Sequence, residues 1–141
     1  MKYIITERQY RLLTEEPEEI LEIPYEAFDY DWDLLQRFLE RRGNPPYKII
    51  GDLNLYNSKI KSLGNLQSVG GNLNLYGSDI KSLGNLQSVG DTLYLYKSNI
   101  KSLGNLQYVG NNLNLQDTPL SKTTTKEEIR SQVEVGGSIY F

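Results

Sequence analysis

GDLNLYNSKIKSLGNLQSVG, residues 51–70, recurs with few changes as GNLNLYGSDIKSLGNLQSVG at 71–90 and as DTLYLYKSNIKSLGNLQYVG at 91–110. A more diverged copy, NNLNLQDTPLSKTTTKEEIR, follows at 111–130. Self-similarity at a fixed period near 20 residues is the signature of a solenoid, in which each copy is one rung stacked on its neighbours. This unit therefore predicts the architecture of the chain.

The apolar residues of the unit recur at fixed positions, as the rungs of a solenoid require. Two leucines alternate with polar residues at the period of a strand, so we expect both leucines to point inward and the rungs to stack about 4.8 Å apart as a parallel sheet. We expect Gly64, Gly70 and their equivalents to form corners with positive φ, and Asn65, Asn85 and Asn105 to point inward and satisfy backbone groups of the turn. The apolar positions are Leu53/Leu73/Leu93/Leu113, Leu55/Leu75/Leu95/Leu115, Ile60/Ile80/Ile100/Leu120, Leu63/Leu83/Leu103, Leu66/Leu86/Leu106 and Val69/Val89/Val109.

Partial copies extend the repeat at both ends. Residues 47–51 align with 67–71, which places Ile49 at the position of Val69. Residues 135–141 align with 69–75, but Ile139 comes 26 residues after Leu113 instead of 20. Thr125 and Glu128 have the spacing of a capping box, which predicts a C-terminal capping helix near 126–132 and a last strand at 138–141.

Residues 1–46 are predicted to form an α-helical N-terminal cap on the first rung, because an uncapped solenoid exposes its core at the end. The clearest helix runs over 31–42, with Asp31 as N-cap, Gly43 after its end and one apolar stripe of Trp32, Leu35, Phe38 and Leu39. A short strand at 2–5 and a capping box at 6–9 precede it.

The predicted fold is thus α+β, mostly β: a right-handed leucine-rich-repeat-like β-solenoid with 20-residue rungs and a parallel sheet, its repeats spanning 47–141 in one domain with the cap. The cycle L-x-x-L-x-x-V-G-G-x-L-x-L-x-x-S-x-I-x-S-L resembles the repeats of the receptor L domain and, more generally, short leucine-rich repeats. It is also similar to repeats in uncharacterised proteins of tailed bacteriophages. The resemblance covers about 47–120 and 133–141 and implies a recognition scaffold without catalytic residues.

Composition narrows the function classes. The 141 residues carry a net charge of −3 and contain neither Cys nor His, which removes disulfides, thiolate metal sites and the commonest general base. We therefore expect no enzyme, no cofactor and no metal site. No apolar run is long enough to span a membrane and the N-terminus lacks the features of a signal peptide. The expected setting is the cytoplasm of a bacterial or phage-infected cell.

The candidate partner-binding residues face outward, between the inward leucines. Stacked Tyr and Asn side chains offer a rigid, amphipathic surface for a protein partner. They are equally compatible with ladders that only stabilise the sheet, and residues 15–30 are placed to cover part of the Tyr row as core. The rows comprise Asn54, Asn74, Tyr94, Asn114 and Tyr140, and beside them Tyr56, Tyr76, Tyr96 and Gln116.

Two alternatives to protein recognition follow from other rows. Lys61, Lys81 and Lys101, together with the Tyr row, are suited to contact phosphates and bases of a nucleic acid. The last strand, with Ile139, Tyr140 and Phe141, carries no charge, so its open edge is suited to self-association as a homo-oligomer. The partner itself is unknown from the sequence.

Overall fold

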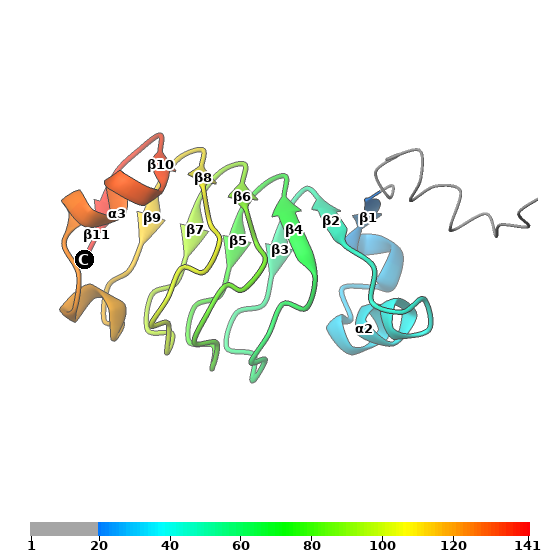
Figure 1. Ribbon diagram of the computed structural model, residues 1–141. Helices are drawn as coiled ribbons and strands as arrows, with labels where there is room; N and C mark the ends of the chain where they lie inside the picture. Colours follow the sequence, from blue (N-terminus) through cyan, green and yellow to red (C-terminus); the bar gives the residue numbers. More distant parts are fainter. Residues whose placement is uncertain (1–19) are drawn as a thin grey trace, which may run out of the picture.

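The computed structural model describes residues 20–141, which form an α+β fold that is mostly β (Figure 1). Two parallel sheets run through the repeats, and two α-helices lie near the ends of this part of the chain. The expected strand at 2–5 and the capping box at 6–9 lie outside the described residues.

The first sheet has six strands in the order β1-β2-β4-β6-β8-β10, all parallel. Its strands are β1 (Leu21–Pro24), β2 (Tyr47–Ile50), β4 (Leu66–Val69), β6 (Ser88–Val89), β8 (Tyr108–Val109) and β10 (Glu134–Val135). The second sheet has five parallel strands in the order β11-β9-β7-β5-β3. These are β3 (Leu53–Asn54), β5 (Leu73–Asn74), β7 (Leu93–Tyr94), β9 (Leu113–Asn114) and β11 (Ile139–Tyr140).

The register of both sheets follows the sequence repeat. Leu53 pairs with Leu73, Leu73 with Leu93 and Leu93 with Leu113, so consecutive copies lie side by side. The partial copies pair as their alignment predicts. Their register pairs are Ile49 with Val69, Val135 with Val109 and Ile139 with Leu113.

The strands on the Val69 side, in the first sheet, were not predicted from the sequence. The expected architecture had one parallel sheet, on the leucine pairs, with Val69 and its equivalents as apolar core positions and the glycine after each as a corner. In the structure the segment around Val69 pairs with its equivalents through Val69 and Val89 and through Val89 and Val109. The acidic segment near residue 20 extends the same sheet, since β1 pairs along its length with β2.

The core lies between the two sheets and is made of the predicted apolar positions. The leucines of the second sheet and the valines of the first are almost fully buried. Ile80 and Ile100 are buried, whereas Ile60, Leu103 and Leu120, toward the ends of the repeats, are only partly buried.

The N-terminal cap consists of a 3-10 helix, η1 (Tyr25–Phe28), and the helix α2 (Trp32–Glu40). Asp31 caps α2 as predicted: its carboxylate accepts a hydrogen bond from the Leu34 N–H at 3.1 Å. The helix ends two residues earlier than predicted. From the expected stripe, Leu35 and Leu39 are buried in the core and the two aromatic residues are partly buried against it.

The C-terminal cap follows a short 3-10 helix, η2 (Leu120–Lys122), and is the helix α3 (Lys126–Gln132). The N-cap half of the predicted capping box is confirmed, because the Glu128 N–H donates to Thr125 Oγ1 at 3.1 Å; the Glu128 carboxylate bonds to the Thr125 hydroxyl, at 3.3 Å, and not to its backbone N–H. Ile129 and Val133 are buried, so α3 closes the end of the core where the fourth copy lacks its corner.

The corner glycines fall into two kinds, which corrects the sequence-based expectation. Gly64, Gly84 and Gly104 have positive φ, at 63°, 56° and 57°. Gly70, Gly90 and Gly110 do not, so the expected positive φ is wrong for them. At Gly90 and Gly110 a side chain is excluded because the preceding repeat is too close: an ideal Cβ on Gly90 would overlap the carbonyl oxygen of Gly70, and one on Gly110 that of Gly90. At Gly70 the contact is milder, with the Gly51 nitrogen 3.2 Å from an ideal Cβ.

The expected inward orientation of the Asn65 row is also wrong. The Leu66 N–H bonds to the Leu63 carbonyl, so Gly64 and Asn65 are the two central residues of a turn and lie at its tip. Asn85 is exposed, and its Nδ2 donates to Asn65 Oδ1 at 3.0 Å. The row therefore forms an outward amide ladder.

Candidate partner-binding face

The outer side of the second sheet carries the predicted Tyr and Asn rows, and we call this surface the Tyr/Asn face. Part of it is a shallow groove of about 350 Å³. Tyr56 and Tyr94 are 58% and 39% exposed, whereas Tyr76 and Tyr96 are half-buried. The groove is lined by Tyr56, Asn74, Tyr76, Tyr94, Tyr96 and Asn114.

Three tyrosines of the face stack on one another along the sheet. The ring centroids of Tyr56 and Tyr76 are 5.4 Å apart at an interplanar angle of 12°. Those of Tyr76 and Tyr96 are 5.2 Å apart at 33°. The ammonium group of Lys97 lies 5.3 Å from the centroid of Tyr96. The rings thus cover one another's faces and present edges and hydroxyl groups to the surface.

The asparagines of the neighbouring row have a local role as well. Oδ1 of Asn54 accepts the Tyr56 N–H at 3.1 Å, and Oδ1 of Asn74 accepts the Tyr76 N–H at 3.0 Å. Asn114 does the same for the Gln116 N–H at 3.0 Å. Each amide oxygen therefore has one lone pair committed to the backbone, which leaves the Nδ2 amino group and the second lone pair of Oδ1 able to bind a partner.

Tyr94 departs from this pattern. It occupies the Asn position of the third repeat, where a phenol has no amide oxygen to offer the Tyr96 N–H. A hydrogen bond of this kind contributes about 0.5–1.5 kcal/mol, so the substitution gives up local stability and adds an exposed aromatic ring in exchange. Among the four longer copies, Tyr94 is the one residue at this position that the repeat scaffold does not explain; Tyr140 holds the same position in the last, partial copy.

The described part of the acidic N-terminal segment does not cover the face. Residues 21–28 form β1 and η1 at the end of the other sheet, and no residue of 20–30 lines the groove. Over this range, the expectation that the Tyr row is covered as core is wrong.

The lysine row does not join the groove. Lys61 lines a cleft beside the N-terminal cap, and Lys101 lines a separate pocket beside α3. Neither cleft contains a tyrosine of the stack. The predicted combination of Tyr and Lys rows is therefore not brought together in one described pocket.

The predicted self-association residues lie at the open side of β11. Ile139 is buried and pairs with Leu113, while Tyr140 and Phe141 are 44% and 36% exposed. Leu113 and Leu115 donate to the Ser138 and Tyr140 carbonyls, at 2.9 and 2.7 Å. By the same register the Ile139 and Phe141 N–H groups face the open side, where the described residues place no further strand.

Arg130 closes the adjoining side of the last repeat, and the sequence analysis missed it. Its Nη1 and Nη2 donate to the carbonyls of Val135 and Gly137 at 3.1 and 2.8 Å. The equivalent carbonyls of Val109 and Asn111 accept the N–H groups of Gly136 and Gly137, at 2.9 and 2.7 Å. The guanidinium group thus replaces the two donors that a further repeat would supply, a role that needs its planar fork.

Replacing Arg130 with methionine should lower the free energy of unfolding by about 1–2 kcal/mol, because two charge-assisted hydrogen bonds to the strand edge are lost at a partly exposed site. Arg130→Lys should retain less than half of the stability that is lost in Arg130→Met. Urea unfolding measures the effect, with Lys122→Met as the matched exposed control. Equal midpoints for Arg130→Met and wild type would contradict the capping role.

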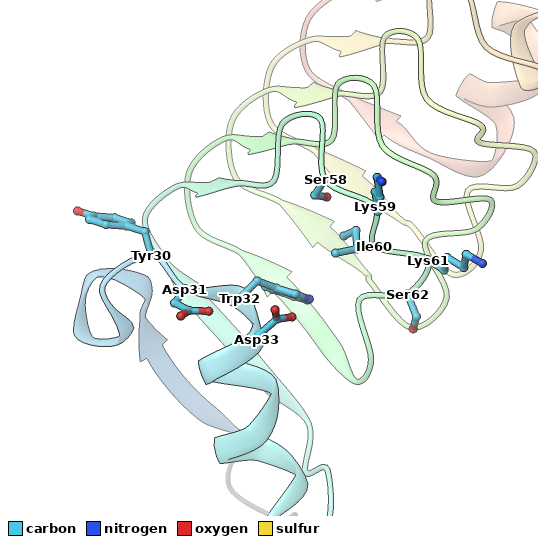
Figure 2. Close-up of a pocket in the computed structure, with 9 residues that line it drawn as sticks. All are labelled: Tyr30, Asp31, Trp32, Asp33, Ser58, Lys59, Ile60, Lys61 and Ser62. Carbon is cyan, nitrogen blue, oxygen red and sulfur yellow. The ribbon is translucent and has the colours of Figure 1, made fainter.

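A second cavity, of about 690 Å³, separates the N-terminal cap from the first repeat (Figure 2). Trp32 and Asp33 point from the start of α2 toward the segment 58–62, while Tyr30 points away from it. The cap side carries Asp31 and Asp33 and the repeat side carries lysines, so the cleft has no single charge preference. Asp31 is moreover committed to the helix N-terminus.

Among residues 20–141 there is no group of three or more His, Cys, Asp or Glu side chains placed to hold a metal ion. No helix within the same range is long and apolar enough to cross a membrane. Comparison of the chain with protein-family models, with curated proteins and with solved structures finds no match.

Proposed function

We propose that the chain is a right-handed leucine-rich-repeat-like solenoid, similar to the receptor L domain, that acts as a non-enzymatic scaffold and binds a protein partner through its Tyr/Asn face. The 20-residue register of both sheets supports the architecture. The cytoplasmic, phage-related setting stays a prediction from the sequence.

The observation that carries the function is Tyr94. Where the first, second and fourth copies place an asparagine that caps their own backbone, the third copy places an exposed ring beside a stack of three tyrosines. Tyrosine is enriched in protein interfaces because it buries a large rigid area with little loss of side-chain entropy. A ladder that served only stability would have kept the asparagine.

Affinity capture from the source cell, using wild type, Tyr94→Asn and Tyr76→Ala, tests this proposal. We expect one set of proteins to be captured by wild type and lost with both variants, with affinity reduced roughly thirtyfold, or about 2 kcal/mol, per substitution. Gln107→Ala, on the other sheet, is the control and should capture the wild-type set. Capture of the same proteins by all four forms would show that the face is structural.

A further inference from the structure

The Tyr/Asn face offers mostly hydrogen-bond donors. The Oδ1 atoms of Asn74 and Asn114, which line the groove, already accept backbone N–H groups, at 3.0 Å in each case. Each of these amides keeps two Nδ2 protons and one oxygen lone pair for a ligand, so its donors outnumber its acceptors, and the phenol hydroxyls of the tyrosines can donate as well as accept. The complementary ligand is rich in acceptors and poor in donors.

The groove also lacks charge. None of its six lining residues is Asp, Glu, Lys or Arg, and the ammonium group of Lys97, beside the groove, lies over the ring of Tyr96. The charge-complementary ligand is a neutral segment. The stack also limits how a nucleic acid could bind: Tyr56, Tyr76 and Tyr96 lie against one another, so no base can enter between these rings.

The distance between the amide groups of Asn74 and Asn114 sets the spacing of the acceptors in a matching ligand. Asn74 and Asn114 lie on β5 and β9, with β7 and Tyr94 between them. Two strand spacings of a parallel sheet are about 9.6 Å. One turn of a polyproline II helix, three residues, rises about 9.3 Å. Carbonyls three residues apart on such a helix would therefore meet the two amides in register.

We propose that the groove binds a proline-rich peptide segment of the protein partner in the polyproline II conformation, lying across the strands. Each proline supplies a carbonyl acceptor and no N–H donor, which matches the donor-rich amides. The polyproline II backbone has no internal hydrogen bonds, so all its carbonyls are available. Proline rings pack against the exposed ring of Tyr94, as in other aromatic-lined grooves for proline-rich ligands.

This inference rests on the proposed function and is tested with the full chain and a labelled nonaproline peptide, about 28 Å long as polyproline II. Fluorescence anisotropy should show binding at least about tenfold tighter, by about 1.4 kcal/mol, than for a Gly/Ser peptide of equal length.

Two variants keep the fold while altering the groove. Asn114→Asp retains an oxygen for the Gln116 N–H but removes the Nδ2 donor, and should weaken nonaproline binding about tenfold. Tyr94→Asn restores the asparagine of the other copies. It should raise the unfolding midpoint slightly and lower the affinity about tenfold or more. Gln107→Ala serves as the control and should bind like wild type.

The outcomes separate the two proposals. No nonaproline binding, or equal binding by wild type and Tyr94→Asn, overturns the polyproline ligand. If Tyr94→Asn nevertheless abolishes partner capture, the Tyr/Asn face still binds protein through another kind of segment. Binding of a neutral oligosaccharide such as cellohexaose that is lost with Asn114→Asp, without nonaproline binding, overturns the polyproline ligand in favour of a glycan.

Discussion

Gly90→Ala should lower the free energy of unfolding by about 3 kcal/mol or more, one of the largest effects expected from adding a single methyl group to this chain. An ideal Cβ at this position would overlap the carbonyl oxygen of Gly70 in the neighbouring repeat. That carbonyl belongs to backbone that cannot rotate away like a side chain. The Gly90 N–H also bonds to the Val69 carbonyl at 2.8 Å, so the added methyl group would push apart a hydrogen-bonded strand pair.

Gly84 provides the matched control six residues earlier in the same copy. Its φ is +56°, but an ideal Cβ there meets no atom within 4 Å. Alanine at Gly84 should therefore cost only about 1 kcal/mol, and asparagine less, because asparagine tolerates the left-handed region. Urea unfolding of the three variants measures the difference. A midpoint for Gly90→Ala equal to that of Gly84→Ala would show that neighbouring repeats can separate to admit a side chain.

Ionisation of Tyr47 should lower the free energy of unfolding of the protein at alkaline pH. The Tyr47 hydroxyl donates to the Leu63 carbonyl at 2.7 Å and accepts a bond from Gln36, at a position only 1% exposed. Burial raises the pKa of Tyr47 from 10.0 to about 12. Below pH 10 the phenol is protonated in the folded and unfolded chains, and its contribution is complete. Between pH 10 and 12 only the unfolded chain loses the proton, so about 3 kcal/mol of stability is lost.

Tyr47→Phe isolates this effect. At pH 7 the variant should be less stable than wild type by about 1–3 kcal/mol, because the Leu63 carbonyl loses its buried donor. The difference should shrink as the pH rises from 10 to 12, since phenylalanine has no proton to lose. Val69→Ala, at a buried position on the neighbouring strand β4, is the control. Parallel stability curves for wild type and Tyr47→Phe over this range would contradict the raised pKa.

Features encoded by residues close in sequence were predictable, and so was the register that a fixed period imposes. The caps at Asp31 and Thr125 depend on side chains three residues from their partners. The pairing of Ile139 with Leu113 followed from alignment alone, despite the insertion before it. Within the site, the Tyr and Asn rows were identified from the alternation of polar residues with leucines.

Features created by contact between distant segments were not predictable. The sequence shows a glycine at position 90 but not why a glycine is needed there. The reason is the close approach of the Gly70 carbonyl in the neighbouring repeat, and not a positive φ. β1 contains Glu22 and Pro24 and becomes a strand because β2 lies beside it. Tyr94 stands out as a candidate binding residue because Asn74 and Asn114, at the same position in other copies, accept hydrogen bonds from their own backbones. The capping role of Arg130 depends on the positions of two carbonyls that follow it in the chain, which the sequence does not give.

Because all the copies pair in the same register, the chain can be lengthened or shortened by whole copies. Leu73 pairs with Leu53 on one side and Leu93 on the other, and Leu93 makes the corresponding pairs one copy later. Removing or duplicating residues 71–90 would leave matching surfaces at the new junction and both ends unaltered. Recombination between such similar copies in the gene would therefore lengthen or shorten the protein by one copy at a time. Each step would move Asn54 relative to Tyr94 by one strand spacing, about 4.8 Å, and would leave Asn114 on the strand next to Tyr94.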